Sequence, residues 1–176
     1  MKLSLWTLAG LIALISSPLP PAIAQTAPST REVAGYFGLH LAAQHGDIAA
    51  IQKLVAEGAD LEVRDSSLRT PLHIATFASH DGAVSALIEA GADPNAYEGQ
   101  NYDIVTIAAV ADDLEMLDLI LNHGANAANA TSPYEGTALI AAAHLGHAEI
   151  VERLISAGAP LDHINNIGWT ALLEAV

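Results

Sequence analysis

The chain contains no cysteine among its 176 residues. This absence excludes disulfides, thiolate metal sites and cysteine nucleophiles. Basic residues are also scarce, with six Lys and Arg against twenty Asp and Glu and a net charge of −14. Because a polyanionic surface repels nucleic acid and anionic lipid, we expect neither as a partner. A protein with a basic surface is the partner that this charge favours.

Aromatic residues make up only 5% of the chain and charged residues 15%, whereas hydrophobic residues reach 52%. So large an apolar fraction excludes intrinsic disorder, and 176 residues suffice for one domain with a sizeable core. The apolar residues are mostly Ala, Leu and Ile. This composition indicates an all-α protein whose helices pack closely through small side chains.

Motifs of catalysis are missing as well. The sequence has no G-x-S-x-G, Walker, dinucleotide or H-E-x-x-H pattern. Two pairs of residues, His144 with His147 and Asp112 with Asp113, support an alternative hypothesis of a metal-dependent hydrolase. A helix turn and a helix N-terminus explain the same residues, and no further ligands stand at suitable spacing. We therefore predict no enzyme activity, no catalytic residue, no cofactor and no metal.

The first 24 residues read as a secretory signal peptide. Lys2 precedes an apolar run from Leu3 to Ile15, and Ala22-Ile23-Ala24 forms a small-residue cleavage site. The run is too short for a stable membrane span, although an uncleaved anchor is the alternative. We expect a mature chain of charge about −15 that begins at Gln25, in a bacterial periplasm or outside the cell, without membrane attachment. Residues 25–34 are predicted to be a linker.

An internal repeat organises the rest of the sequence. Gly-Ala pairs occur four times, 33 or 34 residues apart, at Gly58-Ala59, Gly91-Ala92, Gly124-Ala125 and Gly158-Ala159. Apolar residues precede each pair at positions i, i+3 and i+4, which lie on one face of a helix. The first members of these triplets are Ile51, Val84, Leu117 and Val151. Glycine after each triplet fits a helix that ends in a left-handed residue.

A second, earlier helix is predicted in each unit, rich in alanine, as in Leu39–Ala43 and Leu72–Ala75. Thr70-Pro71 supplies a capping residue followed by proline at the first helical position. Each helix pair alone would expose an apolar face, so the units are stable only when they stack.

These motifs resemble those of the ankyrin-repeat family. Thr70–Ala75 reads as its T-P-L-H-x-A signature, and Gly91–Asn95 as its G-A-D-x-N signature. The resemblance implies an all-α ankyrin-repeat solenoid over residues 35–176, with units at about 35–64, 65–97, 98–131, 132–165 and a partial fifth at 166–176. It also implies that His40 and His73 are buried and tie loops together. Unit three departs from the pattern, because Thr106 stands in the histidine position.

The partial fifth unit leaves Leu172, Leu173 and Val176 without a covering helix. Because a solenoid needs capped ends for solubility, we expect a longer protein or self-association through this end.

The resemblance implies a module that binds a protein through a concave groove lined by loop tips and first helices. An inhibitor, an immunity protein or a support for a periplasmic stress enzyme would fit. The recognition positions map onto Gln44, His45, Ser66, Ser67, Arg69, Phe77, Gln100, Tyr102, Val110, Tyr134, His144, Leu145 and Trp169. Four aromatic residues of this set fall in four different units, as anchors along one groove would.

Overall fold

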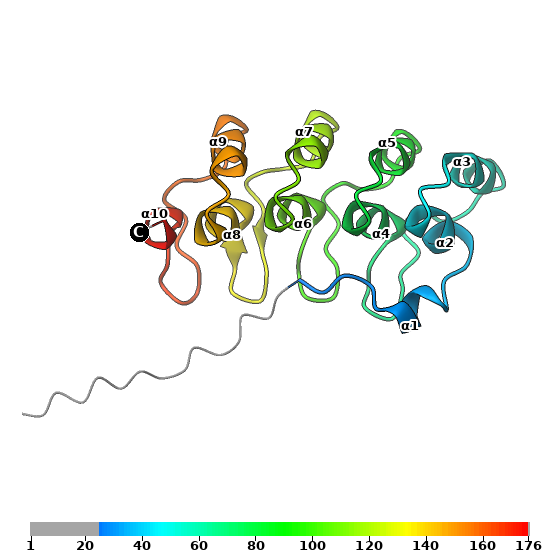
Figure 1. Cartoon of the computed structure of the whole chain (residues 1–176), viewed down its shortest axis with the longest axis horizontal. Coiled ribbons are helices and arrows are strands. Elements are labelled where there is room, and N and C mark those ends of the chain that lie inside the picture. Colours follow the sequence, from blue (N-terminus) through cyan, green and yellow to red (C-terminus); the bar gives the residue numbers. More distant parts are fainter. Residues whose placement is uncertain (1–24, 176) are drawn as a thin grey trace, which may run out of the picture.

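The computed structural model describes residues 25–175 and shows a curved stack of helix pairs (Figure 1). The predicted signal peptide lies outside the described residues. Four pairs follow one another, and a short helix stands at each end of the stack. The helices are α1 (Thr30–Val33), α2 (Gly38–Gln44), α3 (Ile48–Ala56), α4 (Pro71–Phe77), α5 (Asp81–Glu89), α6 (Ile104–Val110), α7 (Leu114–Asn122), α8 (Ala138–Leu145), α9 (Ala148–Ser156) and α10 (Ala171–Glu174). The expected all-α solenoid of stacked helix pairs is confirmed.

The first helices of the pairs, α2, α4, α6 and α8, form an inner row, and the second helices, α3, α5, α7 and α9, form an outer row (Figure 1). Loops project from the inner row on the side away from the outer row. The loop before α8 contains the two strands of the described chain, β1 (Ala130–Thr131) and β2 (Gly136–Thr137), paired antiparallel. Unit four carries one extra residue before Thr137, since its Gly-Ala pair follows the third pair by 34 residues rather than 33.

Side-chain caps begin most of the inner helices. The side chains of Thr70, Asp103, Thr137 and Thr170 each accept a hydrogen bond from a backbone N–H in the first turn of the helix that follows. Such a cap satisfies a donor that has no partner within the helix and is worth about 1 kcal/mol. These caps fix where α4, α6, α8 and α10 start, and therefore the direction in which the preceding loop enters each of these helices.

The core lies between the two rows. The first members of the apolar triplets, Ile51, Val84 and Leu117, are fully buried, and Val151 is half-buried. All residues of α6 except Val110 are buried, because this helix has a neighbour on each side. The last unit is covered less well, and Leu172 and Leu173 of α10 are 74% and 62% exposed. No helix within residues 25–175 has the length and apolar character needed to cross a membrane.

Candidate binding surface

The loops that carry the predicted recognition residues share one internal design. A side-chain oxygen at the start of each loop accepts two backbone N–H groups, from the residues two and four positions later. Asp65 accepts from Ser67 and Arg69, at 2.8 and 2.9 Å. Glu98, Ser132 and Asn165 do the same in the next three units. Each loop is thus closed on itself, which holds its tip in one conformation.

Backbone hydrogen bonds also join each loop to the next. Gly99 donates its N–H to the Ser67 carbonyl at 2.9 Å, and Asn166 donates to the Tyr134 carbonyl at 2.9 Å. The corresponding donor in the loop between them is Pro133, which has no N–H. There the bond moves by one residue, from Ser132 to the Asn101 carbonyl at 2.8 Å. The four loops therefore form one continuous surface.

The structure places most of the predicted recognition residues where a partner can touch them. His45, Ser66, His144 and Leu145 are exposed, and Gln44, Ser67, Phe77, Gln100, Val110, Tyr134 and Trp169 are half-buried. Four of these positions, Gln44, Phe77, Val110 and His144, recur at the C-terminal ends of successive inner helices. The repeat thus brings single residues from each unit into one row.

Two members of the predicted set are not on the surface. Arg69 is 1% exposed and Tyr102 is 7% exposed, so both side chains are buried within this chain. The family pattern predicts that these loop positions are exposed to a partner. In this chain, however, residues N-terminal to the first unit help to cover Arg69. The assignment of Arg69 and Tyr102 as freely available contact residues is therefore corrected.

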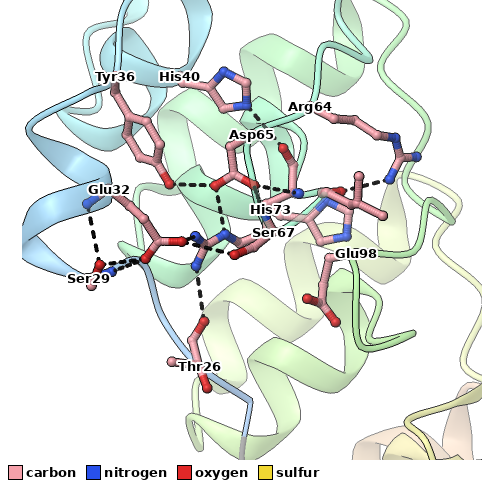
Figure 2. Close-up of polar contacts among 12 residues, drawn as sticks. Thr26, Ser29, Glu32, Tyr36, His40, Arg64, Asp65, Ser67, His73 and Glu98 are labelled. Carbon is pink, nitrogen blue, oxygen red and sulfur yellow. Dashed lines mark hydrogen bonds and ion pairs between the residues drawn. The ribbon is translucent and has the colours of Figure 1, made fainter.

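Arg69 belongs to a polar cluster in which Thr26, Glu32 and Asp65 lie close together (Figure 2). Its guanidinium pairs with Asp65 at 2.9 Å and with Glu32, and donates to the Thr26 carbonyl at 3.2 Å. Hydrogen bonds from the Ser29 side chain and main chain lower the pKa of Glu32 to about 2. Burial acts to raise the pKa of Asp65, but hydrogen bonds from the Arg69 main chain, Tyr36 and the guanidinium outweigh it and hold that pKa below its usual value. Both carboxylates stay ionised, so the buried cation is compensated.

The N-terminal part of this cluster was missed by sequence reasoning. Residues 25–34 were predicted to be a linker, yet they contain the one-turn helix α1. The Ser29 side chain accepts from the Glu32 N–H, while the Glu32 carboxylate accepts from the Ser29 N–H. This is a capping box, and the spacing S-x-x-E in the sequence could have revealed it. That Glu32 also reaches Arg69, 37 residues later, has no local signal.

Several histidines form hydrogen bonds within the stack of helices. His40 donates through Nε2 to the Arg69 carbonyl at 3.0 Å, so it ties its helix to the next loop as the family pattern implies. His73 is fully buried and meets Thr70 through Nδ1, and burial lowers the pKa of His73 to about 4. His147 donates to the Ala109 carbonyl at 2.9 Å. Within residues 25–175 no group of three or more His, Asp or Glu side chains could hold a metal ion.

Unit three replaces the tying histidine by a pair of threonines. Thr106 stands in that position, and its hydroxyl lies 2.9 Å from the hydroxyl of Thr131, in the next loop. Asp103 accepts from the Thr106 N–H and hydroxyl at 2.9 and 2.8 Å. Burial raises the pKa of Asp103. Unit three thus departs from the family pattern in sequence but keeps a hydrogen bond to the next unit, which here joins two threonine hydroxyls.

The exposed charge is mostly negative. Within residues 25–175, the exposed basic side chains are Arg31, Lys53 and Arg64. The exposed acidic side chains are those of Asp47, Glu57, Asp60, Glu89, Asp93, Asp112, Glu115, Glu135, Glu149, Glu152 and Asp162. Lys53 faces Glu57 at 3.9 Å, and Arg64 donates to the carbonyls of Leu68 and Tyr97. Little positive charge is left to offset the acidic surface.

Comparison with known proteins agrees with this architecture. The family model for ankyrin repeats in three copies matches residues 22–98 and 105–176. The chain is 34% identical over 137 residues to the putative ankyrin repeat protein YahD of Escherichia coli, which covers 77% of this chain and 68% of that protein. It is 33% identical over 141 residues to the mouse B-cell lymphoma 3 protein homolog, 77% of this chain but 31% of that protein. The stacked helix pairs, the joined loops and these matches show that the chain belongs to the ankyrin-repeat family, whose repeats are protein–protein interaction modules.

Proposed function

We propose that this chain is a periplasmic scaffold that binds a basic protein through its loops and the C-terminal ends of its inner helices. The observation that carries the proposal is the continuous loop surface. Because the loops are closed individually and bonded to one another, a partner meets a surface that is already ordered. Less conformational entropy is then lost on binding than with flexible loops.

The proposed binding surface also offers aromatic side chains, which occupy different positions within their units. Phe77, Tyr134 and Trp169 come from three different units and are each half-buried, so their rings are supported by the chain and still accessible. Aromatic residues held in this way are frequent hot spots, worth about 2 kcal/mol or more each. The surface offers anchors over much of its length.

The acidic surface favours a basic partner. Long-range attraction between opposite charges raises the association rate, and salt screens it. We expect the association rate to fall as ionic strength rises, with a much smaller change in the dissociation rate. An inhibitor, an immunity protein against a secreted toxin and a support for a stress enzyme are the roles proposed for such a complex.

Capture from periplasmic extract tests the proposal. The immobilised chain is compared with the triple variant Phe77→Ala, Tyr134→Ala and Trp169→Ala, and with a control triple variant that leaves the charge unchanged, Gln52→Ala, Asn122→Ala and Ser156→Ala. The control residues are exposed on the outer helices. We expect the first variant to bind the captured protein at least about thirtyfold more weakly, the loss of about one hot spot. Equal capture by both triple variants would refute binding through the loop surface.

A further inference from the structure

The chain before the first unit lies against positions assigned to partner recognition. Residues 25–32, here called the strap, run beside the loops below α4 and α6 (Figure 1). Figure 2 shows Thr26, Ser29 and Glu32 of the strap close to Asp65 and Ser67 of the neighbouring loop. Ser67 and Arg69, two of the predicted recognition residues, form side-chain hydrogen bonds to this segment.

Polar contacts to the loop of Ser67 and Arg69 help to hold the strap. The Thr26 carbonyl and the Glu32 carboxylate accept from two different nitrogens of the Arg69 guanidinium. The Ser67 hydroxyl donates to Glu32 at 2.9 Å. The capping box with Ser29 orients the same carboxylate. The loop thus recognises a short segment that presents a main-chain carbonyl and, six residues later, a carboxylate.

Little apolar burial keeps the strap in place. Helix α1 contains no buried residue, and Thr26, Ala27, Ser29, Thr30 and Arg31 are exposed. A segment with few buried apolar contacts opens locally without unfolding of the core. The loop underneath is closed by Asp65 through hydrogen bonds that do not involve the strap.

We propose that the strap is an intramolecular occupant of the recognition surface, and that a partner reaches the loop of Ser67 and Arg69 by displacing it. The uncovered loop presents the guanidinium and a hydroxyl, which fit an extended partner segment that carries a carboxylate. This inference rests on the proposed function, because a displaceable strap regulates only a surface that binds. A tethered segment acts at an effective concentration of the order of millimolar, so it weakens every competitor for the same site.

A synthetic peptide of residues 25–37 tests the strap without any partner. The ¹⁵N-labelled whole chain is titrated with unlabelled peptide, and the backbone amide shifts of residues 65–70 are followed by NMR. The chain is compared with the double variant Ser29→Ala and Glu32→Gln, which loosens its own strap. Glu57→Gln is the matched control, since it removes an exposed carboxylate away from this loop.

We expect saturable shifts in the double variant at a peptide concentration at least about tenfold lower than the wild type and Glu57→Gln need. The same peptide with Glu32→Gln should bind the double variant at least about tenfold more weakly, because it lacks the carboxylate that pairs with Arg69. Equal titration of wild type and double variant, or binding by neither, would overturn the proposal.

Hydrogen exchange of the wild-type chain gives an independent measurement if the double variant fails to fold. The amides of Glu32, Val33 and Ala34 are hydrogen-bonded to Ser29 and Thr30 and should exchange at least about a hundredfold faster than the buried amides of α4. Protection equal to that of α4 would show that the strap opens only on global unfolding and would contradict the inference. Neither the peptide titration nor the hydrogen exchange uses the partner. A negative result in these two measurements would therefore refute the strap without refuting binding through the loop surface, and a negative capture result would refute the binding without changing what they show about the strap.

Discussion

At the scale of single residues, the turns between paired helices differ in backbone strain. The turn position is glycine in the first and fourth units, at Gly46 and Gly146, with φ of 64° and 77°. Ser79 and Asp112 occupy it in the second and third units, with φ of 50° and 56°. A side chain in the left-handed region costs roughly 1 kcal/mol, somewhat less for Asp. These two units therefore carry a local strain that the other two avoid.

We predict that Asp112→Gly raises the free energy of unfolding by about 0.5–1 kcal/mol, measured by urea denaturation. Asp112 is exposed and its carboxylate lies 3.8 Å from His147, a contact too long to contribute much. The reverse change, Gly46→Ala, should destabilise, because its Cβ would also stand 2.9 Å from the ring of His80. A stabilising effect of Gly46→Ala, or a loss of stability in Asp112→Gly, would count against the strain.

Burial of His73 makes stability depend on pH. Its folded pKa of about 4 lies below the ordinary value of 6.5, so below pH 6.5 the unfolded chain binds a proton that the folded chain does not. The stability that the fold gains while His73 is neutral is fully present above pH 6.5 and is lost as the pH falls toward 4. The shift corresponds to about 3 kcal/mol over the whole window.

The measurement is the free energy of unfolding at pH 7, 5.5 and 4.5 for His73→Asn, with His123→Asn as a control at an exposed position. We expect a shallower decline for His73→Asn than for the wild type. The decline of the control should match that of the wild type, because His123→Asn leaves the buried His73 in place. If the free energy of unfolding declined equally with falling pH in the wild type and both variants, protonation of His73 would not contribute to the pH dependence of stability.

At the scale of elements, the threonine link between units three and four can be tested alone. Thr106→Val keeps the side-chain volume but removes the bonds to Asp103 and Thr131, and we expect a loss of about 1–2 kcal/mol. Thr76→Val is the matched control, because Thr76 is equally buried but bonds only to Leu72 within its own helix. Calorimetric unfolding should rank Thr106→Val as the more damaging change. If Thr76→Val were the more damaging change, the contact between Thr106 and Thr131 would not contribute to stability as we expect.

Elements with a local cause could be predicted from the sequence. The apolar triplets and the Gly-Ala pairs predicted the outer helices, and Thr70-Pro71 predicted the start of α4. The role of Thr106 could not be predicted, because its partner Thr131 lies in another unit and hydroxyl pairs have no characteristic spacing. The burial of Arg69 could not be predicted for the same reason, since its partners Thr26 and Glu32 lie far away in the sequence.

At the scale of the whole molecule, repetition turns separate residues into a surface. Gln44, Phe77, Val110 and His144 share no local motif, yet the stack aligns them at the ends of successive inner helices. The repeat period predicted this row because each unit occupies the same place relative to its neighbour. The strap breaks the repetition at one end, so part of the recognition surface is covered by the chain itself.

Site-specific photo-crosslinking in intact cells tests the central claim most directly. A photoreactive amino acid replaces Tyr134 or Leu145 on the proposed binding surface, or Gln52 or Glu152 on the outer helices. Adducts are separated by mass and identified by mass spectrometry. The account predicts that positions 134 and 145 yield adducts with one and the same basic protein, and that positions 52 and 152 do not. Adducts with that protein from the outer helices alone, or none from any position, would contradict it.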